Sequence, residues 1–154
     1  MINLKKCNFV KEFVYLGFVI LDEGLKMDLE KVKAIIEWPT PRNIIEVRSF
    51  HGLASFYRKF IRNFSSICAP LIETMRGGKK EFKWTAKVGT SFEMLKKKVT
   101  EQPILVLPDF NKVFQVDCDA SGYAIGAVLS QEGKPIAYFS EKLNNARKKY
   151  SIYN

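Results

Sequence analysis

The chain has 154 residues and a net charge of +9, and this length is enough for one globular domain or two small ones. Its residues are 47% hydrophobic and 27% charged, a balance that excludes a disordered chain. Its longest apolar stretches run only a few residues, which excludes a membrane-spanning helix of about 20 residues, and charges flank the short apolar run near Met1, so we expect no secretory signal and no membrane partner. Three widely separated cysteines and a single histidine exclude a zinc site of the usual spacing, and we expect reduced cysteines in an intracellular protein.

The first part of the chain carries the signals of two strands and a helix. Residues 4–10 and 13–20 are rich in Val, Phe, Tyr and Ile, which predicts two strands of a hairpin with a turn at residues 11–12. Asp28 can cap a helix over residues 29–38, which the following proline would end.

The next predicted helix carries an apolar and a basic stripe side by side. Asn43 and Glu46 have the spacing of a capping box at its start. The apolar stripe is Val47, Phe50, Ala54, Tyr57 and Ile61. One residue further round lie Arg48, His51, Ser55, Arg58 and Arg62. We expect the first stripe to pack in a core and the second to present three guanidiniums in a row. The aromatic residues at core spacing, expected to pack rather than to stack on bases, are Phe50, Phe56, Tyr57, Phe60 and Phe64.

The pattern then changes from helices to strands. Two further helices are predicted over residues 65–75 and 91–100, with a short extended link at 81–84 between them. Strand-like periodicity predicts three consecutive antiparallel strands, followed by the start of a helix. These four segments are 113–118, 123–129, 135–139 and 143–153. This order indicates an α+β chain, and we do not expect one compact core to cover all of it.

The net charge is confined to the middle of the chain. Residues 41–100 hold thirteen Lys or Arg against four Asp or Glu, whereas residues 1–40 and 101–154 are each balanced. A polyanion-binding surface would produce such segregation, so nucleic acid is the favoured partner. On composition alone a solvated basic face stays open as an alternative, as does an anionic membrane surface, although we expect no membrane partner.

Short blocks of residues resemble the polymerases of gypsy-class LTR retrotransposons, and they occur in the order and spacing of that family across nearly the whole chain. Their residues are most similar to those of plant elements. The blocks are YLGF (15–18), EWPTP (37–41), VRSFHGL (47–53), FYRKFI (56–61), APL (69–71), FKWT (82–85), LPDF (107–110), CDAS (118–121), IGAVLSQ (125–131) and PIAYFS (135–140). The resemblance implies a reverse transcriptase and RNase H region that is incomplete at both ends. Its expected parts are the end of the palm with a primer-grip-like hairpin (1–24), a thumb-like helical unit (25–78), a connecting segment (79–112) and the N-terminal part of an RNase H-like domain (113–154).

The resemblance also implies which residues hold nucleic acid. Those at the hairpin would grip the primer end, where Gly17 would let the backbone approach the primer closely. The basic stripe would meet the phosphates or groove edges of an RNA–DNA or DNA duplex, in a sequence-tolerant and salt-sensitive way. The expected nucleic-acid-binding residues are Tyr15, Leu16, Gly17, Arg48, His51, Arg58 and Arg62. The alternatives are an ordinary edge hairpin, a basic face that serves solubility and, for His51, a polar helix residue.

Asp119 is the residue to which the resemblance assigns the most specific chemical role. It matches the first metal-binding carboxylate of RNase H-type enzymes, in which several carboxylates hold two divalent ions, Mg²⁺ in the complete parent enzyme. Asp117 matches no metal ligand of the family and is interpreted as a polar residue of a strand edge. The other RNase H carboxylates, and the Tyr-x-Asp-Asp block of the palm, do not occur in this sequence. We therefore expect the chain alone to be neither polymerase nor nuclease and to bind no Mg²⁺ stably.

Two interpretations of this expected fragment stay open. In the first, the chain works with the rest of the parent polyprotein, in a cytoplasmic particle or the nucleus. In the second, a host has retained the thumb as a non-catalytic module that binds nucleic acid or protein. Because an RNase H sheet without its helices exposes an edge and an apolar face, self-association through residues 113–140 is a further expectation.

Overall fold

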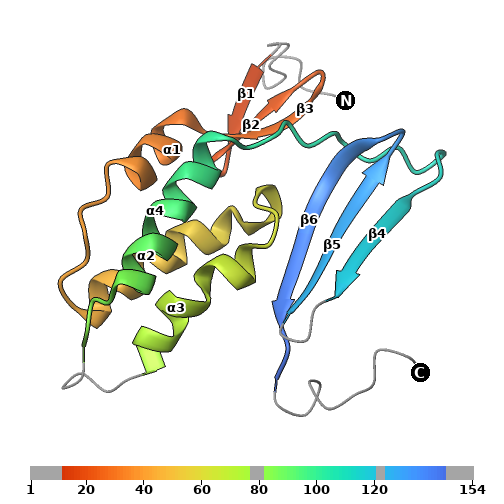
Figure 1. The fold of residues 1–154 in the computed structure, drawn as a ribbon. Coiled ribbons are helices and arrows are strands. Elements are labelled where there is room, and N and C mark those ends of the chain that lie inside the picture. The colour runs from red at the N-terminus through yellow and green to blue at the C-terminus, as the bar shows by residue number, and fades with distance from the viewer. Residues whose placement is uncertain (1–11, 77–81, 121–123, 145–154) are drawn as a thin grey trace, which may run out of the picture.

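The computed structural model describes residues 12–76, 82–120 and 124–144, in which two small sheets flank a helical unit (Figure 1). The strands are β1 (Glu12–Tyr15), β2 (Phe18–Leu21), β3 (Gly24–Met27), β4 (Gln115–Ala120), β5 (Ala124–Gln131) and β6 (Lys134–Lys142). The helices are α1 (Leu29–Ile36), α2 (Ile44–Phe56), the 3-10 turn η2 (Arg58–Phe60), α3 (Phe64–Arg76) and α4 (Ala86–Thr100). The chain is α+β, as predicted. No helix within the described ranges is long and apolar enough to cross a membrane.

The N-terminal sheet is an antiparallel meander in the order β1-β2-β3. A single strand over residues 13–20 is the wrong prediction here, because Leu16 and Gly17 adopt positive φ angles of 49° and 79° and form a two-residue turn. Such a turn matches the twist of the strands on either side. The predicted strand at 4–10 and its turn lie outside the described residues. Gly24 starts β3, so the expected boundary between palm and thumb falls inside this sheet.

Side-chain caps start the first two helices where the sequence predicts them. The Asp28 carboxylate accepts a hydrogen bond from the Glu30 amide at 3.0 Å, although α1 ends two residues earlier than predicted. Asn43 accepts from the Glu46 amide at 3.0 Å and donates to its carboxylate at 2.7 Å. These bonds satisfy helix-end groups that would otherwise lack partners.

The second predicted helix is shorter than its apolar spacing suggests. It ends at Phe56, and the chain continues through η2 and through Asn63, whose φ of 58° turns the backbone into α3. A 3-10 turn repeats every three residues, so Tyr57 and Phe60 keep their buried positions without belonging to the helix. The predicted row of three guanidiniums on one helix is therefore wrong. α3 agrees with its prediction to within one residue at each end, whereas α4 begins five residues earlier than predicted because Thr85 caps it at the Val88 amide.

One hydrophobic core joins the N-terminal sheet, all four helices and the linker after α4. Its largest fully buried side chains are Tyr57, Phe50, Phe60, Phe92, Met27, Ile35, Ile61, Leu71, Leu95 and Leu105. The Phe50 ring lies at its centre, 4.5 Å from that of Phe92 between centroids. Tyr138 of β6 packs against this cluster, but no residue of the C-terminal sheet is among its buried members, so this core does not cover all of the described residues, as expected. The aromatic residues pack as predicted except Phe56, which is 51% exposed and stacks on Phe18.

The C-terminal sheet is the predicted meander, in the order β4-β5-β6, and lies against the helices (Figure 1). The Ser65 amide donates to Ser140 Oγ at 2.8 Å, and Ser65 Oγ donates to the Ser140 carbonyl at 2.7 Å. Lys142 reaches Glu73 on α3 at 2.8 Å. Every residue of β4 is exposed. Self-association through this region stays a prediction, and the helix expected from residue 143 lies almost wholly outside the described residues.

The linker after α4 ties the two sheets together. Leu105 exchanges two backbone hydrogen bonds with Leu25 of β3, at 2.7 and 2.9 Å, and the next residue bonds to Pro135 of β6. The buried Gln131 side chain accepts from the Asp109 amide at 2.9 Å and donates to the carbonyls of Asp109 and Lys112. The part of the expected connecting segment that follows α4, residues 101–112, thus links the two sheets.

Candidate nucleic-acid interface

The tip of the β1–β2 hairpin presents apolar side chains to solvent. Tyr15 is 55% and Leu16 70% exposed. The Tyr15 ring stacks on that of Phe13, with 6.0 Å between centroids. Two of the three residues expected to grip a primer are therefore accessible at one turn.

Gly17, the third of these residues, faces inward. Its carbonyl accepts a hydrogen bond from the Tyr57 hydroxyl at 2.9 Å and from the Asp28 amide at 3.2 Å. A Cβ atom at this position would lie 2.8 Å from the Tyr57 hydroxyl oxygen. The missing side chain thus permits a contact inside the chain, which the sequence interpretation did not include.

The basic residues expected to meet a duplex are exposed and follow the path of the chain across three elements. Arg48 lies on α2, Arg58 on η2 and Arg62 in the segment before α3. Lys59, which the predicted stripe omitted, lies over the Phe18 ring at 4.1 Å from its centroid. Arg58 and Arg62, close to Lys59 in sequence, belong to the predicted basic stripe. The local excess of basic residues was therefore the signal that could have identified Lys59 as well.

His51 is half-buried beside the basic residues. Its ring lies 6.1 Å from that of Phe64, and the Ser55 hydroxyl lies 3.4 Å from Nδ1. Burial lowers the pKa of His51 below its usual 6.5, which favours the neutral ring. The neutral ring can contribute a hydrogen bond to this surface.

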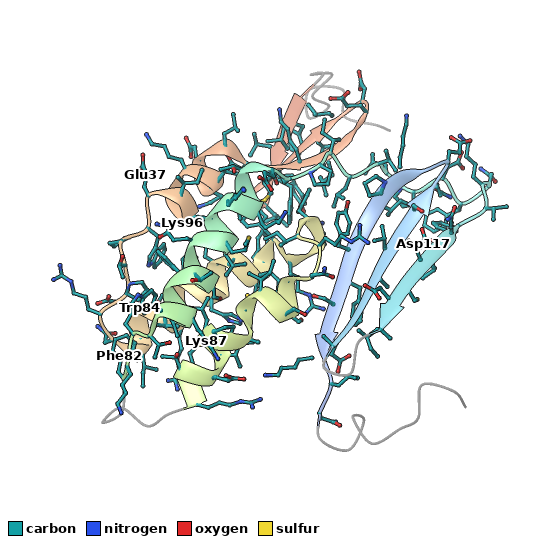
Figure 2. The ribbon with its side chains drawn as sticks, in the orientation of Figure 1. Glu37, Phe82, Trp84, Lys87, Lys96 and Asp117 are labelled. Atoms are coloured by element: carbon teal, nitrogen blue, oxygen red, sulfur yellow. The ribbon has the colours of Figure 1, made fainter. Side chains whose placement is uncertain are left out.

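The fold brings Arg62 next to the carboxylates of β4. A small cavity of about 10 Å³ is lined by Arg62, Asn63, Asp117, Asp119, Gly126, Ala127 and Val128. Asp117 is labelled on the outermost strand of the sheet in Figure 2. The Asn63 side-chain oxygen lies close to Gly126: a Cβ atom added at Gly126 would be 3.1 Å from this oxygen. Asp119 therefore shares one side of the sheet with the basic segment, a proximity across 57 residues that no local pattern predicts.

The described residues do not supply a complete metal site around Asp119. Asp117 is the other carboxylate at the cavity, and the Gln115 amide donates to both of its oxygens at 3.0 and 3.2 Å. No group of three or more His, Cys, Asp or Glu side chains suited to a metal ion occurs in this part of the chain. Because Mg²⁺ requires near-octahedral oxygen coordination, and a two-metal site requires several carboxylates, these residues do not fit such a site.

Comparison with known proteins agrees with this architecture. Residues 84–154 match the RNase H-like domain found in reverse transcriptase. Over 97% of its length the chain is 41% identical to the Pol polyprotein of transposon 297 and 40% identical to that of transposon gypsy, both from Drosophila melanogaster. It spans only 14% and 16% of those two proteins. An uncharacterised Arabidopsis thaliana mitochondrial protein, AtMg00860, is 40% identical over 73% of this chain and 72% of its own length.

Solved structures show the same fold. A foamy viral protease–reverse transcriptase in complex with RNA/DNA hybrid has a TM-score of 0.84 and 29% identity, over 96% of this chain and 21% of that one. The same type of protein in complex with double-stranded DNA has a TM-score of 0.82 and 28% identity, over 92% of this chain and 30% of that one. The chain thus contains the RNase H-like domain found in reverse transcriptase and is, over most of its length, a homologue of the Pol polyproteins of gypsy and other LTR retrotransposons.

Proposed function

We propose that this chain is the part of a retrotransposon reverse transcriptase that holds the primer–template duplex, joined to the start of the RNase H-like domain. The observation that carries the proposal is the succession of exposed arginines along α2, η2 and the segment before α3, within the part of the chain that holds the whole net charge. The related foamy viral structures contain double-stranded DNA or an RNA/DNA hybrid, which supports the same class of ligand here.

In this proposal the two exposed regions have different tasks. Arg48, Arg58 and Arg62 contact phosphates, which suits a polymerase because phosphate contacts do not depend on the template sequence. Tyr15 and Leu16, at the hairpin tip, contact the primer strand near its end. The proposed partners are therefore an RNA–DNA or DNA duplex and the remainder of the parent polyprotein.

Duplex binding by this chain is expected to weaken steeply with salt. Each phosphate contact contributes about 0.9 to the slope of log affinity against log salt concentration on B-DNA, so replacing Arg48, Arg58 and Arg62 together with Ala should reduce the slope by roughly 2 to 3. The measurement is fluorescence-anisotropy titration of a labelled 20-base-pair DNA duplex and RNA–DNA hybrid at several salt concentrations.

The control for duplex binding removes the same number of charges elsewhere. Lys33, Lys112 and Lys134 are exposed and lie in the two segments whose charge is balanced, so their joint replacement with Ala should leave the slope nearly unchanged. A flat slope for the unmodified chain, or an equal loss in both triple variants, would contradict the proposed surface.

The chain alone is proposed to cleave no RNA, because Asp119 and Asp117 do not make a two-metal site. A labelled RNA–DNA hybrid incubated with the chain and Mg²⁺ should therefore remain intact. Cleavage that disappears in Asp119→Asn would overturn this proposal, since it would show that the carboxylate acts in a working site. Cleavage that persists in the variant indicates a contaminating nuclease, to be removed before the assay is repeated.

A second candidate function is that of a non-catalytic module retained by a host. It is favoured by the Arabidopsis relative, which matches this chain over 72% of its own length and is therefore of similar size. Mapping the transcript and the reading frames around the coding sequence separates the two candidates. A reading frame that encodes the rest of the polymerase supports the reverse-transcriptase candidate, and a separate short transcript supports the host-retained module.

A further inference from the structure

Three elements meet on one carbonyl oxygen at the base of the hairpin tip. Gly17, in the turn between β1 and β2, accepts hydrogen bonds from the Tyr57 hydroxyl at 2.9 Å and from the Asp28 amide at 3.2 Å. Asp28 caps the start of α1, and Tyr57 caps the end of α2. The turn is therefore fixed directly to the helical unit, 40 residues away in sequence.

Aromatic side chains enclose this contact. The Phe18 ring stacks on the rings of Phe56 and Phe60, with centroid distances of 5.0 and 5.9 Å, and meets the edge of Tyr57 at 5.5 Å. The Lys59 ammonium covers the Phe18 ring. Tyr57 is only 1% exposed, so little water competes for its hydrogen bond.

The Tyr57 hydroxyl is held in the form that can donate. Burial, with a smaller contribution from the Asp28 carboxylate, raises the pKa of Tyr57 to about 12. The phenol thus stays protonated throughout the working pH range. A phenylalanine would fill nearly the same space but leave the Gly17 carbonyl with one donor fewer.

We propose that Tyr57 is a positioning residue, whose hydroxyl fixes the hairpin tip to the helices so that Tyr15 and Leu16 meet the primer strand at a constant distance from Arg58. This inference rests on the proposed function for its consequence at the primer. Its physical part concerns the chain alone: the hairpin and the end of α2 form one rigid body. Without this hydrogen bond, the Asp28 amide and the Phe18 ring still hold the base of the turn, but the tip can shift relative to Arg58.

Native-state hydrogen exchange tests the rigid body directly, because segments that open together share one opening free energy. In the unmodified chain, the protected amides of β2 and β3 should open together with those of α2. Tyr57→Phe should raise the exchange of the hairpin amides and of Asp28 by roughly five- to tenfold, the effect of losing one hydrogen bond, and leave α4 unchanged. Tyr138→Phe, which removes a hydroxyl from β6, should not have this effect.

Crosslinking tests the positioning. A photoreactive residue in place of Leu16 should crosslink to one position of the primer strand in the parent chain, and in Tyr57→Phe to several positions in comparable amounts. Affinity for the duplex should change less than twofold, because the basic residues are intact. An unchanged crosslinking pattern, or a hairpin that already opens independently in the parent chain, would overturn the inference.

The two measurements separate this inference from the proposed function. If the chain binds no duplex, the proposed function fails, whereas the exchange experiment still decides whether Tyr57 fixes the hairpin. If Tyr57→Phe lowers the protection of hairpin, α2 and α4 equally, the hydroxyl stabilises the whole fold and the positioning role is rejected.

Discussion

Replacing Phe50 with Ala is expected to lower the free energy of unfolding by about 3 to 5 kcal/mol, the usual cost of removing a buried aromatic ring. Phe50 is fully buried, and its ring contacts those of Phe92 and Trp38, with centroid distances of 4.5 and 6.0 Å. The cavity would lie inside the core, between α2, α4 and the Trp38 ring that follows α1. A chain of this size has only about 5 to 15 kcal/mol of total stability.

A second phenylalanine on the same helix provides the matched control. Phe56 is 51% exposed and stacks on Phe18 at its outer side, so Phe56→Ala should cost about 1 kcal/mol. Urea unfolding followed by circular dichroism measures both variants. Equal losses would mean that α2 does not pack as described.

The parts of this fold that could be predicted are those with local causes. Asp28 and Asn43 start helices through hydrogen bonds to residues two and three positions ahead, so their effect is visible in sequence. The C-terminal meander follows from alternating strand residues separated by the short turn at Glu132 and Gly133. Phe50, Tyr57 and Phe60 are buried because helical and 3-10 periodicities place them on similar faces, and Phe64 is buried at the start of α3.

The parts that could not be predicted depend on unusual backbone angles. Leu16 adopts a positive φ that leucine rarely takes, so the pattern of residues 13–20 offered no reason to divide the strand. Beyond the conformational freedom of Gly17, the turn is stabilised by Tyr57, which lies far along the chain. Likewise Asn63 turns the chain into α3, and the apolar spacing before it cannot distinguish a helix that continues from one that tightens into a 3-10 turn.

The candidate site shows the same division. The charge of residues 41–100 predicts a surface for nucleic acid, and the three arginines are indeed exposed. The sequence could not show that Arg62 reaches the side of the sheet that carries Asp119, because this proximity depends on how β5 and β6 dock against α3. Nor could the sequence show that the Gly17 carbonyl bonds to Tyr57, because the two residues are 40 positions apart.

Gly24→Ala is expected to destabilise the chain by more than about 2 kcal/mol, because two effects act at once. Gly24 has a φ of 145°, which side chains rarely adopt, and a Cβ atom there would lie 2.3 Å from the Leu105 carbonyl oxygen. That carbonyl accepts the hydrogen bond from Leu25. The linker would have to move away from β3, and the strap between the two sheets would loosen.

Gly52 is the matched control for this substitution, since it lies in α2 and a Cβ atom added there would meet no atom within 4 Å beyond its own stretch of helix. Gly52→Ala should stabilise the chain by up to about 1 kcal/mol, because alanine favours the helix. The urea concentration at the midpoint of unfolding should thus be lower than that of the parent chain for Gly24→Ala and higher for Gly52→Ala. If Gly24→Ala were neutral, β3 and the linker would not be in contact in solution, and the N-terminal hairpin would be attached to the rest of the fold through the helices alone.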